Sequence, residues 1–395
     1  MAVVNYEMTK QYPELGTGPV SVEPYVSPEY FEKEREKIFA RSWLNVGRDD
    51  QIPNAGDFFV REIEVMKASI ILVRSKDKVV RAFHNVCTHK GNRVCIDENG
   101  NTKGFQCCFH GWVFDTSGSL VSIPGQELFY NLDKAKLGLR EVSCDVWNGF
   151  IFINLQATPD ISLQEYLGPE FLHRFDDYPF DELQLQQSHR VRVKCNYKIF
   201  IDAFQEGLHV SHVHRRSLPD TLTSAETPIV HQEMEVYERH RMAAVTFNPG
   251  ATVSPMMEAM GRNLGASYLF RDPAKQPKGL NFKNDPHWIF DINVFHPNWR
   301  FVAYQDSYLY ETYWPISVNE TIWDLSFYCR PPQTAGQKIF SQVQAGMIDV
   351  LREDLSTLER TQAALESGVL KEIQLSDEEL LCRHMHKVVE DAVKA

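Results

Sequence analysis

Two short cysteine-histidine pairs are the first residues in this chain whose types and spacing could do chemistry. Cys87 and His89 are separated by one residue, and Cys107 and His110 are separated by two. Two loops of this kind could bring two thiolates and two imidazoles to one metal centre. Zinc accepts the same ligands, but zinc fingers usually pair Cys with Cys and His with His along the chain. One Cys and one His from each loop suits a two-iron cluster in which two Cys hold one iron and two His hold the other.

A second group of candidate ligands lies in residues 196–214, where the sequence predicts a helix. At about 100° per residue, Asp202, Glu206 and His209 fall within about 60° of one another on one face of that helix. A solvated surface would explain such a polar stripe, but two acidic residues four apart repel each other mildly. The stripe is therefore a candidate site.

Three histidines in this segment compete for a metal. In a straight helix, His212 would lie about 60° from His209 and His214 about 140° away. Helical geometry alone therefore favours His209 with His212. Two histidines and one carboxylate form the usual ligand set of non-heme iron(II), which leaves positions open for dioxygen.

The carboxylate for such a site is expected from a late helix that begins near Gln337. Its apolar stripe includes Met347, and Asp354 lies within about 20° of the centre of that stripe. Asp349 points away from the stripe, and Glu353 lies about 120° off. Only Asp354 places a charge on the buried face, where it is costly unless it binds a metal or another cation.

The residues around the cysteine-histidine pairs resemble a known family. Residues 83–91, FHNVCTHKG, and 107–112, CCFHGW, resemble the two cluster loops of Rieske-type non-heme iron oxygenases. The family commonly has other residues at Lys90 and at Cys108-Phe109, but these are not ligand positions. The resemblance implies four ligands of a Rieske [2Fe-2S] cluster: Cys87, His89, Cys107 and His110.

The same resemblance extends to the second group of ligands. Oxygenases of this family carry a His, four residues and a second His on a helix that breaks or bulges between them, and His209 and His214 match this spacing. Residues 353–362 resemble the family's carboxylate-ligand helix, which again selects Asp354. The resemblance therefore implies mononuclear iron held by His209, His214 and Asp354, with His212 as the open alternative.

Two further acidic residues gain roles from the resemblance. In the family, an acidic residue at the place of Glu206 bridges the iron-bound His to a cluster His of the neighbouring subunit. Asp202 is expected to lie behind the ligands and support them. A relay between subunits requires a cyclic oligomer, so a homotrimer (α3) is expected, and an α3β3 assembly stays open.

The elements that must position these residues divide the chain into three parts. Residues 1–44 form an N-terminal helical segment, expected to pack on the catalytic domain, with a helix that starts at Ser27-Pro28-Glu29. Short β-branched stretches broken by Gly, Asn and Asp indicate an all-β Rieske domain over residues 45–155. Residues 156–395 alternate helical patterns with long aromatic strands, which cover 288–328. The expected fold is α+β, with a catalytic antiparallel sheet covered by helices in a helix-grip-like arrangement.

Composition narrows the class of protein further. With 41 Lys+Arg against 53 Asp+Glu the net charge is −12, which argues against a nucleic-acid partner. We find no secretory signal and no run of ~18 apolar residues, so a cytoplasmic protein without a membrane span is expected. No G-x-G-x-x-G follows a strand, so NAD(P)H is expected to act only indirectly, through a separate reductase, with or without a ferredoxin.

The sequence therefore predicts the terminal oxygenase component of a Rieske non-heme iron oxygenase system. It would use O2 and relayed electrons to hydroxylate an apolar, aromatic or polycyclic substrate, by cis-dihydroxylation or monohydroxylation. Met256, Met257 and Met260 suggest a broad apolar pocket. An oxidative N- or O-dealkylating monooxygenase is the alternative within the family. A Rieske electron carrier without oxygenase activity is the alternative of another class, but it would need only the cluster domain.

Overall fold

The chain folds into two compact units. A computed structural model describes residues 8–218, 222–223, 230, 232–248, 250, 273–330 and 337–395. The side chains of residues 8, 9 and 337–344 are not described. One unit combines Met1–Glu34 with Leu167–Ala395, and the other is Arg35–Tyr166. Within the described part of the chain, no helix has both the length and the apolar character needed to cross a membrane.

The division into units differs slightly from the division predicted from the sequence. The structural boundaries follow Glu34 and Tyr166. The predicted three-part division into residues 1–44, 45–155 and 156–395 stays a prediction.

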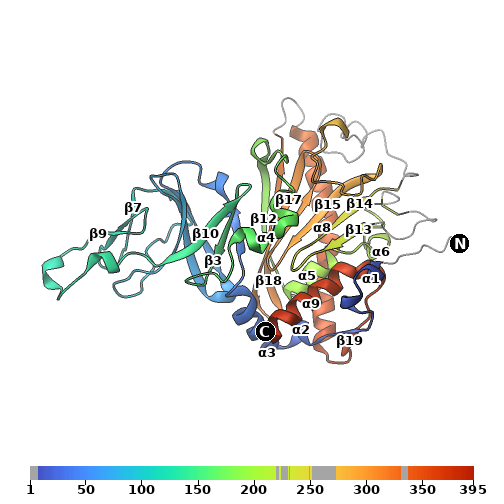
Figure 1. Ribbon diagram of the computed structural model, residues 1–395, viewed down its shortest axis with the longest axis horizontal. Coiled ribbons are helices and arrows are strands. Elements are labelled where there is room, and N and C mark those ends of the chain that lie inside the picture. Colours follow the sequence, from blue (N-terminus) through green and yellow to red (C-terminus); the bar gives the residue numbers. More distant parts are fainter. Residues whose placement is uncertain are drawn as a thin grey trace. The chain divides into compact units, whose positions relative to one another are not determined.

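After a π-helical turn at Arg35–Phe39, the regular structure of the unit Arg35–Tyr166 consists mainly of antiparallel strands joined by loops and short 3-10 turns. Its larger sheet has seven strands in the order β2-β11-β10-β5-β4-β3-β6, and its smaller sheet has three in the order β7-β8-β9 (Figure 1). The strands are β2 Leu44–Arg48, β3 Asp57–Ile63, β4 Ala68–Arg74, β5 Val80–His84, β6 Asn99–Asn101, β7 Gly104–Gln106, β8 Val113–Asp115, β9 Leu120–Ser122, β10 Glu141–Trp147 and β11 Phe150–Asn154.

One tight hairpin shows how the sequence sets the register of this sheet. β10 and β11 pair Trp147 with Phe150, so only Asn148 and Gly149 form the turn. Both turn residues have positive φ, +48° and +78°. Asn-Gly is the preferred sequence for such a two-residue turn, because both positions need the left-handed conformation.

The other unit is organised around a second seven-stranded antiparallel sheet, in the order β12-β18-β17-β16-β15-β14-β13. Its strands are β12 Gln184–Val193, β13 Gln232–Val236, β14 Arg241–Thr246, β15 Trp288–Phe295, β16 Trp299–Ala303, β17 Ser307–Ser317 and β18 Glu320–Cys329. The last four contain the aromatic segment from which strands were predicted. A short pair, β1 Val20–Ser21 and β19 Glu372–Ile373, joins the two ends of the chain.

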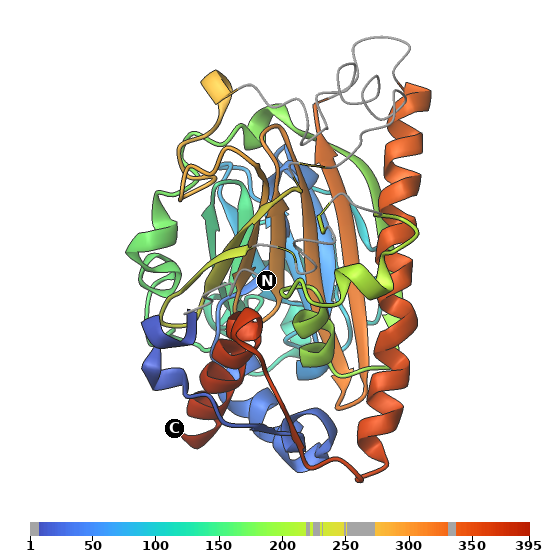
Figure 2. The same ribbon diagram turned by 90° about the vertical axis from the view of Figure 1, so that its right-hand side faces the viewer.

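Helices lie on this sheet, as Figures 1 and 2 show. α8 contacts α5 and α2, α5 also contacts β17, and α9 contacts β13 and β14. The α-helices of the described segments are α1 Met8–Gln11, α2 Glu23–Val26, α3 Pro28–Glu34, α4 Leu163–Leu172, α5 Tyr197–Ala203, α6 Val210–Val213, α8 Gln337–Glu366 and α9 Leu380–Lys394. The α+β fold class predicted from the sequence is confirmed.

The helix predicted over residues 196–214 is not continuous, and this prediction was wrong. α5 ends at Ala203 and α6 begins at Val210, so the segment between them is not helical. The Glu206 side chain accepts hydrogen bonds from the backbone N–H groups of Leu208 and His209, in competition with helical bonding. Angles calculated for a straight helix therefore do not apply to the histidines that follow.

Two candidate metal centres

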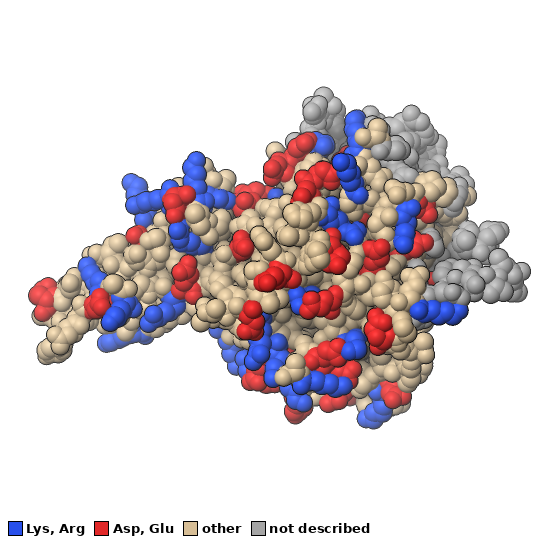
Figure 3. Space-filling view, in the orientation of Figure 1, with Lys and Arg blue, Asp and Glu red and all other residues tan. Residues whose placement is uncertain are grey.

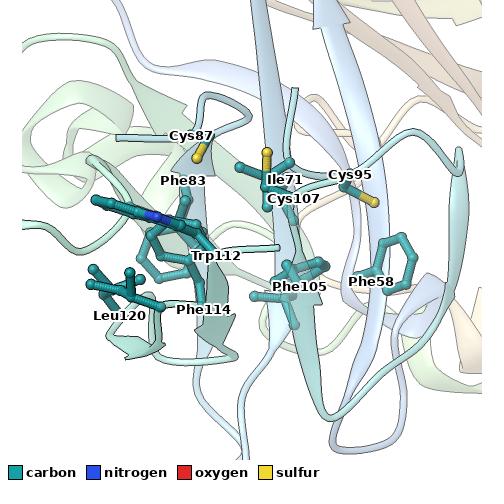
Figure 4. Packing of buried hydrophobic residues seen from close by; sticks show 14 residues of the cluster. Phe58, Ile71, Phe83, Cys87, Cys95, Phe105, Cys107, Trp112, Phe114 and Leu120 are labelled. Carbon is teal, nitrogen blue, oxygen red and sulfur yellow. The ribbon is translucent and has the colours of Figure 1, made fainter. Parts of the chain in front are cut away.

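The two cysteine-histidine loops fold into the same turn. The Gly91 N–H donates to the Cys87 carbonyl and the Gly111 N–H donates to the Cys107 carbonyl, both at 2.9 Å. Gly91 and Gly111 have φ of +77° and +72°, a conformation that favours glycine. The repeated Cys-x-x-x-Gly spacing thus reflects one backbone requirement used twice. Both cysteines are buried in the same hydrophobic cluster (Figure 4).

The two histidines of these loops also lie together. The ring centroids of His89 and His110 are 4.5 Å apart, and His89 stacks on Trp112 at 4.7 Å. The buried Nδ1 atom of His89 has no hydrogen-bond partner. A buried nitrogen without a partner is costly, whereas a metal ion would satisfy it. The four side chains therefore fit the ligand set of a [2Fe-2S] cluster with two Cys and two His.

Hydrogen bonds distinguish the two candidate cysteine ligands. Burial raises the pKa of the Cys87 thiol. Burial also acts to raise the pKa of Cys107, but hydrogen bonds from the Phe109 N–H and the Asn92 side chain lower it overall. Asn92 Nδ2 lies 3.7 Å from Cys107 Sγ and 3.4 Å from the exposed Cys108 Sγ. Asn92 is therefore placed to stabilise negative charge on Cys107.

The second candidate centre brings together His209, His214 and Asp354. Asp354 Oδ1 lies 3.4 Å from His209 Nε2 and 2.9 Å from His214 Nε2. One ligand atom from each of the three residues lies within 4.8 Å of the others. His209 is the N-cap and His214 the C-cap of the four-residue helix α6, while α8 supplies Asp354. Two imidazoles and one carboxylate match the facial ligand set of non-heme iron(II).

A pair of carboxylates lies behind the two histidines. Glu206 contacts His209 Nδ1, and Glu353 Oε2 lies 3.0 Å from His214 Nδ1. A carboxylate on Nδ1 favours the tautomer with the proton there, so each Nε2 lone pair is left for a metal. Burial acts to lower the pKa of His214, but Asp354 and Glu353 raise it overall. The site thus attracts positive charge and fits a metal cation.

Sequence reasoning missed the contact between Glu353 and His214. Glu353 was considered only as a ligand and set aside because its helical angle is about 120° from the apolar stripe. That same angle places it beside the outer nitrogen of His214, where Ser217 Oγ also donates to it at 2.5 Å. The sequence signal for this contact was that Glu353 directly precedes the candidate ligand Asp354.

The remaining candidates lie away from the triad. His212 is exposed, and its Nδ1 lies 2.9 Å from Ser211 Oγ. Asp349 is exposed as well. Asp202 accepts hydrogen bonds from Tyr25 and Gln205, and it is not one of the three residues whose ligand atoms converge in the described structure.

A cavity of about 150 Å³ opens beside the triad. Its walls are largely aliphatic and include Val245, Ile292, Val302, Leu309 and Leu351. Met256, Met257 and Met260, from which a pocket was predicted, lie outside the described residues. The cavity places an apolar space next to the candidate metal ligands.

Comparison with protein families agrees with both centres. Residues 42–133 match the family described as "Rieske [2Fe-2S] domain", and residues 180–395 match "Ring hydroxylating alpha subunit (catalytic domain)". Together these two domains define the class of Rieske oxygenases, which hold a Rieske cluster and a mononuclear iron. The chain belongs to the ring-hydroxylating alpha subunit family.

The relatives that match this chain are named for different reactions. The chain is 35% identical over 198 residues to the alpha subunit of biphenyl 2,3-dioxygenase from Rhodococcus jostii (strain RHA1), over 49% of this chain and 42% of that one. It is 33% identical over 192 residues to the oxygenase subunit of carnitine monooxygenase from Escherichia coli (strain K12), over 48% and 50%. These matches span about half the length of the relatives.

Solved structures share the fold over nearly the whole chain. A quaternary ammonium Rieske monooxygenase superposes with a TM-score of 0.77 at 19% identity, covering 96% of both chains. Naphthalene 1,2-dioxygenase from Rhodococcus sp. superposes with a TM-score of 0.74 at 20% identity, covering 98% of this chain and 96% of that one. At these identities the likeness concerns the fold alone.

Proposed function

We propose that this protein is the terminal oxygenase component of a Rieske non-heme iron oxygenase system. The observation that carries the proposal is the convergence of His209, His214 and Asp354 on one point beside an apolar cavity. A Rieske electron carrier would need no such second centre. The proposed domains are residues 1–44, 45–155 and 156–395.

The proposed ligands follow from the geometry of the two centres. Those of the mononuclear iron are His209, His214 and Asp354, and those of the [2Fe-2S] cluster are Cys87, His89, Cys107 and His110. When bound, the cluster would supply single electrons and the iron would activate O2.

The protein's own residues prepare the iron site in two ways. Glu206 and Glu353 hold the outer nitrogens of the two histidines, which favours the neutral tautomer with its proton on Nδ1 and its Nε2 lone pair available to a metal. The aliphatic side chains in the cavity wall make the same space largely apolar. We further assign to Glu206 the link to a cluster histidine of a neighbouring subunit, and to Asp202 a supporting role behind the site.

The cavity supports an apolar substrate about the size of one aromatic ring, because a cavity of about 150 Å³ can hold benzene. Aromatic hydroxylation, by cis-dihydroxylation or monohydroxylation, agrees with the similarity to a biphenyl dioxygenase. Oxidative N- or O-dealkylation is the second candidate, which the similarity to carnitine monooxygenase favours.

The proposal includes partners and an assembly. Electrons would come from NAD(P)H through a reductase, with or without a ferredoxin. The assembly would be a homotrimer, with an α3β3 form as the alternative, in the cytoplasm.

Purification followed by metal analysis tests the proposal. We expect a coloured protein with two cluster irons and one mononuclear iron per chain, which consumes O2 with a reductase, a donor and an aromatic substrate. His209→Ala should keep the cluster absorption and lose O2 consumption, whereas Cys107→Ala should lose the cluster. A colourless zinc protein would contradict the proposal. With ¹⁸O2, two labelled oxygens in one product indicate dioxygenation and one indicates monooxygenation.

A further inference from the structure

A buried ion pair lines the cavity beside the proposed iron site. Arg300 on β16 and Glu311 on β17 are direct cross-strand partners, and both line the cavity. Arg300 Nη1 lies 2.5 Å from Glu311 Oε1, and the guanidinium carbon lies 5.2 Å from the centre of the Phe204 ring. A fixed guanidinium therefore interrupts an otherwise largely aliphatic wall.

Glu311 is occupied on both oxygens. Oε1 accepts from Arg300, while Oε2 accepts from the Tyr313 hydroxyl at 2.7 Å and from Trp323 Nε1 at 3.3 Å. Its side chain has no exposed surface. Glu311 is thus held by protein groups and serves to position and neutralise Arg300.

Arg300 keeps one donor atom that no protein group uses. A guanidinium has five N–H donors, and the buried Nε of Arg300 has no hydrogen-bond partner. The residue is only 6% exposed, but it lines the cavity, so a ligand in the cavity would lie beside the guanidinium. A buried donor without a partner is unfavourable, and a ligand with an acceptor atom would relieve that cost.

The charge of the pair restricts what that acceptor can be. Glu311 already balances the positive charge of Arg300, so the pair as a whole is neutral. A carboxylate on the ligand would therefore find no free counter-charge in this ion pair, and its burial beside the pair would be costly. An uncharged oxygen could accept the hydrogen bond without that cost.

We propose that Arg300 binds an uncharged acceptor oxygen, such as a carbonyl, on a substrate with one aromatic ring. The inference rests on the proposed oxygenase function and specifies its substrate class. Arg300 would bind the oxygen, and the aliphatic wall that includes Val302 and Leu309 would hold the ring.

Three ligands of nearly the same shape test this proposal: acetophenone, cumene and benzoate. They carry a neutral acceptor, no acceptor and a charged acceptor on the same ring. Binding would be measured anaerobically on the metal-loaded protein by equilibrium partition. We expect acetophenone to bind about tenfold more tightly than cumene, as for one net hydrogen bond, and more tightly than benzoate.

The variants must not leave Glu311 buried without a partner. Arg300→Met alone risks unfolding for that reason, so the test variant is Arg300→Met with Glu311→Gln, in which the amide still accepts from Tyr313 and Trp323. We expect the preference for acetophenone over cumene to disappear in this double variant. Arg192→Met, at an exposed arginine on β12 of the same sheet, is the matched control and should keep the preference.

Each other outcome overturns the inference. Equal binding of acetophenone and cumene, or a preference that survives in the double variant, would show that Arg300 does not bind the substrate. Tighter binding of benzoate would replace the uncharged acceptor with a carboxylate. Should none of the three bind while cluster absorption and iron content are normal, the one-ring class is wrong but the oxygenase proposal stands.

Discussion

At the scale of single residues, the atoms behind the ligands matter as much as the ligands. Each histidine of the triad has a carboxylate at Nδ1, Glu206 for His209 and Glu353 for His214. This arrangement directs both Nε2 atoms to Asp354. The two supporting carboxylates therefore select one tautomer and one orientation for each ring.

The choice between His212 and His214 is testable by metal content. We expect His214→Ala to lower mononuclear iron from about one per chain to near zero, because His214 is buried against Asp354. His212→Ala should keep the iron, because His212 is exposed. Cluster absorption, unchanged in both variants, is the control. Iron loss in His212→Ala with retention in His214→Ala would reverse the assignment.

The reduction potential of the cluster should depend on Asn92. Its amide N–H lies against Cys107 Sγ and would stabilise the extra negative charge of the reduced cluster. We expect Asn92→Leu to lower the potential, and Asn92→Asp, which adds a negative charge, to lower it further. A redox titration followed by absorption measures both. A potential unchanged in both variants would mean that this contact is too weak to matter.

At the scale of secondary structure, the helices of the catalytic unit are joined by buried polar contacts. Lys198 on α5 and Glu34 on α3 form an ion pair 2.6 Å long, with both side chains almost wholly buried. Tyr25 on α2 lies 2.5 Å from Asp202 on α5 and 2.6 Å from His386 on α9. These contacts hold α5, the helix that precedes the metal ligands, against its neighbours.

Breaking the ion pair from one side should destabilise the protein. We expect Lys198→Met to lower the free energy of unfolding by about 3 to 5 kcal/mol, because Glu34 would be left buried without its charged partner. The double variant Lys198→Met with Glu34→Leu should regain most of that loss. Urea unfolding measures both. A double variant as unstable as the single one would show that the pair itself contributes the stability.

The Asp202 contact predicts a pH dependence of stability. Burial raises the pKa of the Asp202 carboxyl to about 7 in the folded protein, against about 4 when unfolded. Between these values the folded state holds a proton that the unfolded state has released, so stability should fall as pH rises from about 4 to about 7. The slope from one group is at most about 1.4 kcal/mol per pH unit.

Urea unfolding at several pH values measures that slope. Asp202→Asn should flatten it, whereas Asp181→Asn, at an exposed carboxylate, should leave it unchanged. An equal slope in wild type and Asp202→Asn would contradict the prediction.

At the scale of the whole molecule, the chain carries two proposed centres in two separate units. Acidic and basic side chains are interspersed on the face that Figure 3 shows, although the net charge is −12. Net charge alone therefore does not identify a docking surface for an electron donor. Electron transfer between the two proposed centres would depend on how the chains assemble.

Mixed oligomers test whether electrons pass between subunits. Cys107→Ala should lack a cluster and His209→Ala should lack mononuclear iron, so each variant alone should be inactive. We expect co-expressed, co-purified hybrids to regain part of the O2 consumption, because one chain would supply the cluster and its neighbour the iron. Differently tagged chains ensure that only hybrids are assayed. Inactive hybrids with both centres present would contradict a relay between subunits.

The sequence by itself determined the features that depend on local spacing. The two cysteine-histidine loops need only a tight turn with a positive-φ glycine, and the Asn148-Gly149 turn sets its hairpin register. The aromatic strands and the buried side of Asp354 follow from periodicity along one element.

Only the tertiary structure decided the features that depend on distant residues. The break between α5 and α6 arises where the Glu206 side chain takes backbone hydrogen bonds, and it brings His214 to Asp354. Arg300 and Glu311 become partners only because β16 and β17 pair in one register. Periodicity describes one element at a time, whereas these contacts result from packing between elements.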